Sequence, residues 1–84
     1  MNFGLQYYKG IQIKLVNRSY KGKQAKRYVI NNTNQNVWIP NVHLHDDGTL
    51  KAEENIDYIF RKAHRQLTLA GITQPIPGIK RLSR

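Results

Sequence analysis

The residues of this chain that come closest to a reaction centre are two histidines followed at once by carboxylates, in the run His43-Leu44-His45-Asp46-Asp47. On a strand, imidazoles two residues apart point to the same side, and histidine and carboxylate are zinc ligands. The competing interpretation is a polar strand end that runs into an Asp-Asp-Gly turn. His64 is the only other histidine of the chain, so the turn is favoured, and we expect no metal.

Other catalytic constellations are missing from the sequence. The serines are Ser19, in a polar loop, and Ser83, next to the terminus, and neither has the surroundings of a nucleophile elbow. The six glycines occur singly, which is not a phosphate-binding loop, and there is no cysteine to supply a thiolate. A chain of 84 residues is also too short for a deep catalytic cleft. We therefore expect a protein that is not an enzyme, with no catalytic residues and no cofactor.

Positive charge is densest between residues 14 and 27. This segment has no acid and carries the cations Lys14, Arg18, Lys21, Lys23, Lys26 and Arg27, with Tyr20 among them. A hairpin that projects from a sheet can bring such cations to phosphates without burying charge, and a β-ribbon fits the major groove of DNA. The competing interpretation is that the lysines keep an exposed hairpin soluble, and the sequence leaves both open.

A second set of cations follows later in the chain and is given a lesser role in the same binding: Arg61, Lys62, Arg65, Lys80 and Arg81. The first three also suit the second half of a helix, because the helix dipole favours cations there. The last two form a basic terminus after a proline-containing spacer, which is typical of a phosphate-tracking arm and also of a frayed end. Trp38, Tyr7 and Tyr8 could stack on bases, but a core position is favoured for Trp38.

The elements that must position these residues are three strands and one helix. Alternation of apolar and polar residues predicts strands over 11–16, 27–30 and 37–39, with an Asn-rich turn over 31–36. A helix is predicted from about Thr49 to about Ala70, with Gly71 just beyond its end. Its apolar stripe is Ile56, Ile59, Phe60, Ala63, Leu67 and Ala70, and its opposite face carries Asp57, Arg61, Lys62 and Arg65.

The fold class is therefore α+β, with a three-stranded antiparallel sheet packed on one C-terminal helix in the order β-β-β-α. Residues 1–71 form a single small domain. Pro75, Pro77 and Gly78 exclude a continuous helix after it, so residues 72–84 are expected to form a basic extended segment.

The net charge of +9 exceeds the roughly 2–8 that solubility requires, which suggests a polyanionic partner. No stretch approaches the length of a membrane span, and the opening residues do not have the pattern of a signal peptide. We expect a cytoplasmic protein without a membrane partner.

Three resemblances accompany these patterns. Val37-Trp38-Ile39-Pro40, Leu44, Asp47-Gly48-Thr49 and Tyr58-Ile59-Phe60 resemble segments of small uncharacterised proteins of Gram-positive bacteriophages and mobile elements. That resemblance covers residues 28–62 and implies an origin, with no site residues. The β-β-β-α order resembles the arm-binding domains of tyrosine recombinases, which lay a sheet in the major groove, and His43 to Asp47 resembles the opening of the HxHxD motif of metallo-hydrolases.

The sequence thus predicts a nucleic-acid-binding module that contacts phosphates through the hairpin 14–27, and leaves the choice between DNA and RNA open. The alternative is a phage or mobile-element protein that acts on a host factor through a protein interface. A third interpretation, a small metal-dependent hydrolase built on His43 and His45, is disfavoured because the further ligands are missing.

Overall fold

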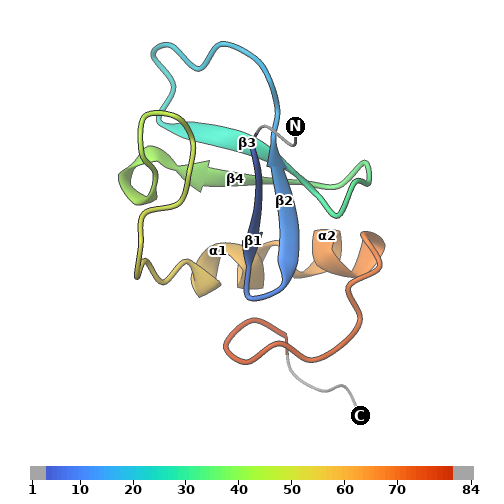
Figure 1. Cartoon of the computed structure of the whole chain (residues 1–84). Coiled ribbons are helices and arrows are strands. Elements are labelled where there is room, and N and C mark those ends of the chain that lie inside the picture. The colour runs from blue at the N-terminus through green and yellow to red at the C-terminus, as the bar shows by residue number, and fades with distance from the viewer. Residues whose placement is uncertain (1–3, 81–84) are drawn as a thin grey trace.

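A four-stranded antiparallel sheet and two short helices make up the computed structural model, which describes residues 4–80 (Figure 1). The strands are β1 (Leu5–Tyr8), β2 (Ile11–Leu15), β3 (Ala25–Ile30) and β4 (Asn36–Pro40), in the spatial order β1-β2-β3-β4. A short 3-10 helix η1 (Asn41–His43) follows, and then α1 (Asp57–Lys62) and α2 (His64–Leu69). The α+β class and the antiparallel sheet are confirmed, whereas the predictions of three strands and one helix are wrong.

The strand that the sequence did not indicate is β1. It pairs with β2 from Leu5 opposite Lys14 to Tyr8 opposite Ile11. Lys9 and Gly10 connect the two strands with φ values of 50° and 84°. Two consecutive positive φ angles define the tight turn that matches the twist of a hairpin, and lysine is not its usual first residue. The strand was missed because β1 lacks regular alternation and its turn lacks the usual asparagine.

The Asn-rich turn between β3 and β4 is confirmed. Asn31 and Asn32 have φ values of 53° and 57°, and the Thr33 amide donates to the Ile30 carbonyl at 3.0 Å. Asparagine tolerates the left-handed region better than other non-glycine residues, which is why a run of asparagines predicts a turn.

The predicted helix begins later than expected and is divided in two. The amide and hydroxyl of Thr49 both donate to the Asp47 carboxylate, at 3.0 and 2.6 Å, and Glu53 has a φ of 65°, so neither residue is helical. The side chain of Asn55 accepts a hydrogen bond from the Asp57 amide at 3.0 Å, an Asx turn that directly precedes α1. Ala63, with ψ at 22°, separates α1 from α2, because helical backbone requires a ψ near −42°.

The hydrophobic core lies between one face of the sheet and the two helices, which Figure 1 shows together below β3 and β4. The predicted apolar stripe is confirmed: Ala63 is half-buried and the other five residues are buried. Tyr28 and Phe60 are the largest fully buried side chains.

The chain after Gly71 returns to this core and does not extend away from it as far as residue 80. Ile72, Ile76 and Ile79 are buried, and Ile76 and Lys80 form an isolated bridge. Gly78 has a φ of 82°, and a Cβ there would lie 2.3 Å from a carboxylate oxygen of Asp57, so glycine is required at this contact. The expectation of an extended arm is therefore wrong for residues 72–80, because three isoleucines favour burial over exposure. Residues 81–84 lie outside the described part of the chain.

Asp57, expected on the exposed face of the helix, is instead 6% exposed. Its carboxylate accepts hydrogen bonds from the Tyr8 hydroxyl at 2.5 Å and from the Lys9 ammonium at 2.8 Å. The bonds from Lys9 and then Tyr8 lower the pKa of Asp57, since both favour the charged carboxylate. The ion pair between Lys9 and Asp57 connects the β1–β2 turn to the first turn of α1.

We expect the contribution of Asp57 to stability to depend on pH. Because its pKa is lower in the folded than in the unfolded protein, the contribution is present above about pH 4 and is lost as the pH falls through the folded pKa. Asp57→Asn should lower the free energy of unfolding at pH 7 by about 1–3 kcal/mol, because Tyr8 and Lys9 lose a charged acceptor. Urea unfolding at several pH values should show the parent and the variant converging in acid. A constant difference between them down to pH 2 would contradict this assignment.

Candidate nucleic-acid interface

The two faces of the sheet differ in what covers them. One face packs on the helices, and its opposite, here called the open face, has no buried residue. The open face is defined by the alternate strand positions that point away from the core: Leu5, Tyr7, Gln12, Lys14, Ala25, Arg27, Val29, Asn36, Trp38 and Pro40. None of these ten residues is acidic.

Aromatic rings stand on this open face. Tyr7 is 62% exposed and Trp38 is 46% exposed, although large apolar side chains are usually buried. The expected core position for Trp38 is wrong, because its neighbours Val37 and Ile39 point into the core and alternation turns Trp38 outward. Tyr8 is on the core side, where its ring stacks on Phe60 with centroids 5.2 Å apart, so it is not part of the open face.

Two cations lie among these aromatic side chains. Lys14 is exposed and is the register partner of Leu5 and Val29. Arg27 is half-buried and stands opposite Trp38 on the neighbouring strand. The open face therefore presents rings and positive charge at adjacent positions.

The loop over residues 16–24 continues this surface beyond the ends of β2 and β3. Its anchor is Tyr20, whose hydroxyl donates to the Val16 carbonyl at 2.7 Å. The ring of Tyr20 meets that of Trp38 edge-on, with centroids 6.5 Å apart, and the Arg18 guanidinium lies 6.0 Å from the ring centroid of Tyr20. Figure 1 shows the loop above β3, with both helices below β4.

The remaining cations of the predicted hairpin differ in their exposure to solvent. Lys21 and Lys23 are exposed in the loop. Lys26 is on the core side of β3 and is half-buried, and its ammonium donates to the Asn41 side chain at 3.2 Å. Lys26 is therefore partly occupied by an internal contact, whereas Lys21 and Lys23 are exposed to solvent.

The later cations are not brought to the open face, because they belong to elements that cover the core side. Arg61 donates to the Gly78 carbonyl at 2.7 Å, and Arg65 is exposed on α2. Lys80 donates to the Thr68 hydroxyl at 2.8 Å. Lys62 comes nearest to the open face, because it lines a cavity at the edge of β4 that Asn36, Trp38 and Pro40 also border. Arg81 lies outside the described residues.

The loop that carries Asp46 and Asp47 is held on the core side of the sheet. The Gly48 carbonyl, next to Asp46 and Asp47, accepts hydrogen bonds from the Gln6 amide at 2.9 Å and from the buried Tyr28 hydroxyl. Burial raises the pKa of Tyr28 to about 12, so this hydroxyl remains a donor even in mildly alkaline solution. The anchoring keeps the two aspartates away from the open face, so they do not repel a polyanion there.

The histidine pair does not form the arrangement that the sequence suggested. His43 is in η1, where its Nδ1 meets Glu54 at 2.6 Å and its Nε2 meets the Tyr58 hydroxyl at 2.8 Å. His45 is exposed beyond η1, so the two imidazoles do not share a strand. Within residues 4–80, no three histidine, aspartate or glutamate side chains lie close enough together to hold a metal ion.

Comparison of the chain with protein-family models, with curated proteins and with solved structures finds no match. Within the described range 4–80, neither helix has the length and apolar character needed to cross a membrane.

Proposed function

We propose that the protein is a non-enzymatic nucleic-acid-binding module that uses the open face together with the loop 16–24. The observation that carries this proposal is the combination of exposed rings and cations, without acids, on the sheet face opposite the two helices. A net charge of +9 adds a long-range attraction to polyanions.

The two kinds of side chain have different tasks in this proposal. Lys14, Arg18, Lys21 and Lys23 neutralise phosphates and release counterions, which provides affinity without sequence preference. Tyr7 and Trp38 stack on bases, which requires bases that are not paired within a duplex. The module should therefore prefer single-stranded DNA or RNA to a duplex, since a duplex offers phosphates but no free base faces.

Titration with labelled oligonucleotides tests this function directly. A single-stranded 12-mer and the matching duplex are compared at low and at physiological salt. Trp38 is the only tryptophan of the chain, so quenching of its fluorescence reports contact on the open face. We expect tighter binding of the single strand and a strong salt dependence. Failure to bind at low salt, where electrostatic attraction is greatest, would refute the function.

Trp38→Ala should weaken single-strand binding by about 1–3 kcal/mol, or roughly 5- to 150-fold, because one stacking platform is lost. Leu69→Ala is the matched control, since Leu69 is 59% exposed but lies on α2. Trp38→Phe should retain most of the affinity, and all three variants are compared by fluorescence anisotropy with a labelled 12-mer. Equal losses in Trp38→Ala and Leu69→Ala would place the stacking elsewhere.

A further inference from the structure

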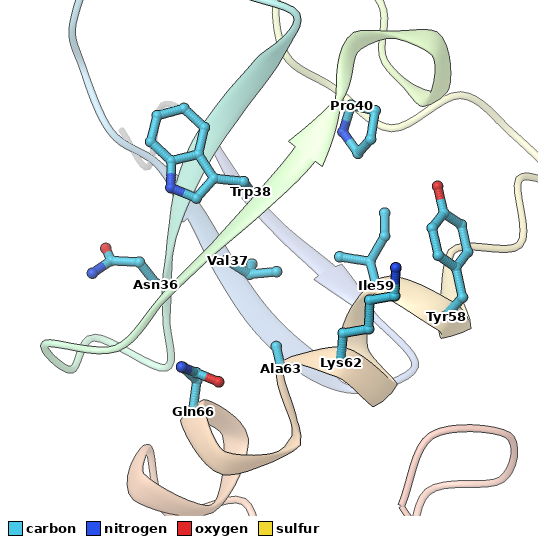
Figure 2. A pocket seen from close by; sticks show the side chains of 9 residues that line it. All are labelled: Asn36, Val37, Trp38, Pro40, Tyr58, Ile59, Lys62, Ala63 and Gln66. Atoms are coloured by element: carbon cyan, nitrogen blue, oxygen red, sulfur yellow. The ribbon is translucent and has the colours of Figure 1, made fainter.

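A groove runs along the outer edge of β4, between this strand and the two helices (Figure 2). Its cavity volume is about 370 Å³. Asn36, Trp38 and Pro40 mark the strand side, and Ile59, Lys62 and Gln66 are on the helix side. In Figure 2 the Trp38 ring points away from the helices, so the groove is bordered here by the β4 backbone.

The backbone of β4 on this side is not used by the sheet. The Ile30 amide donates to the Gln35 carbonyl and the Asn41 amide donates to the Gln24 carbonyl, both at 2.8 Å. In an antiparallel pair the hydrogen-bonded positions alternate, so these two bonds set the phase for all of β4. Asn36 and Trp38 are at the intermediate positions, where the N–H and C=O groups point away from β3.

These outward groups have no backbone partner among residues 4–80. β4 is the last strand of the sheet, and the amides of Asn36 and Trp38 donate to no backbone carbonyl in this range. Pro40, at the end of the strand, has no N–H, which limits the free edge to the segment before it. An edge of this kind can accept one more strand through main-chain hydrogen bonds.

The helix side of the groove supplies contacts for the side chains of such a strand. Ile59 and Ala63 provide apolar surface, Gln66 an amide and Lys62 an exposed ammonium group. Of the residues between 4 and 80 that line the groove, none is acidic. Side chains of an added strand alternate between the helix side and the Trp38 side, as they do in any strand.

We propose that this groove binds an extended peptide of a partner protein, which adds to β4 as a fifth strand and places a carboxylate near Lys62. The apolar residues of the peptide and this carboxylate occupy alternate positions on one face of the added strand, the face that meets Ile59, Ala63 and Lys62. This binding activity differs from nucleic-acid binding in the groups it uses, the backbone edge of β4 and the helix side of the groove, and the two surfaces meet at Asn36, Trp38 and Pro40.

Charge and geometry favour a peptide over the other occupants. A nucleic acid has no backbone donors at the spacing of a β-ladder, and among the described residues Lys62 is the only cation that lines the groove. A second copy of the chain would bring two molecules of net charge +9 together, which is unfavourable without an acidic counterpart on the same edge.

The probe for the test is an end-blocked heptapeptide with threonine at the odd positions, valine at the second and sixth positions and glutamate at the fourth, so that valine and glutamate share one face. Binding is followed by amide NMR of the full chain, in which the Asn36 and Trp38 amides should shift and gain protection from exchange. Two further peptides carry N-methyl groups on alternate sets of amides. One of these two peptides should bind at least tenfold more weakly than the unmethylated peptide and the other should not, because only one set of amides faces β4. Equal behaviour of the two sets would overturn the proposal.

Variants of the protein test the same contact from the other side. Asn36→Pro removes an outward N–H at an edge position where proline is tolerated, and should weaken the peptide at least tenfold. Asn36→Ala retains the N–H and is the matched control, with circular dichroism as the check on folding. Lys62→Glu should weaken the glutamate peptide about threefold or more and favour a lysine peptide, whereas Arg65→Glu, an exposed charge reversal on α2, should do neither.

Three other results would refute the proposal. The peptide fails to bind, an oligonucleotide displaces it and shifts the same two amides, or those amides are protected in the free protein at high concentration while sedimentation shows a dimer. The first leaves the nucleic-acid function untouched, because that function is measured by a separate titration. The second assigns the groove to nucleic acid, and the third assigns it to a second copy of the chain.

Discussion

Phe60→Ala is expected to lower the free energy of unfolding by about 3–5 kcal/mol. The side chain is fully buried and stacks on Tyr8, between α1 and the first strand of the sheet. Its removal leaves a cavity that a core of this size cannot close by relaxation. Since small domains are often stable by about 5–15 kcal/mol, such a loss can leave a large fraction of the variant unfolded.

The measurement is urea unfolding followed by circular dichroism. Phe60→Leu keeps an apolar side chain in the site and should lose less stability, while Tyr7→Ala, on the open face, should change it by about 0.5 kcal/mol or less. If Phe60→Ala were as stable as Tyr7→Ala, the packing of α1 against the sheet would be wrong.

The second large effect concerns the salt dependence of nucleic-acid binding. Replacement of Lys14, Lys21 and Lys23 by alanine should reduce the slope of log K against log salt by about 2–3, since each phosphate contact contributes about 0.7–0.9. All three side chains are exposed, so the fold should not change. At low salt the variant should bind much more weakly than the parent.

A matched control separates local contacts from overall charge. Lys51, Lys62 and Arg65 are exposed and lie off the open face, so their joint replacement by alanine removes the same net charge from a different surface. We expect a clearly smaller change of slope for this control in fluorescence titrations between low and physiological salt. Equal slopes for the two triple variants would show that binding follows net charge and that the open face has no special role.

Local patterns in the sequence predicted the elements whose residues follow a regular period. Alternation of apolar residues located β2, β3 and β4, and the 3.6-residue period of the stripe identified the buried side of α1 and α2. The asparagine run predicted the turn at Asn31 and Asn32, because asparagine itself tolerates the positive φ angles that this turn requires. The cations of the loop 16–24 were also evident, since charge is a property of composition.

The tertiary structure decided which of these surfaces remains uncovered. Strand alternation divides side chains between two faces, but only the packing of the helices determines which face is open, and this exposes Trp38. The burial of Asp57 depends on Tyr8 and Lys9, which are 49 and 48 residues away.

Three buried isoleucines bring residues 72–80 back to the core, although the prolines of this segment prevent a helix. The free edge of β4 depends on the order of the strands in the sheet. A periodic pattern reports which residues are alike along the chain, whereas burial, ion pairs and strand edges depend on partners that are distant in sequence. For this protein, the sequence therefore determined three of the four strands, the buried side of the helices and the excess of positive charge, and the tertiary structure determined where that charge and the aromatic rings meet.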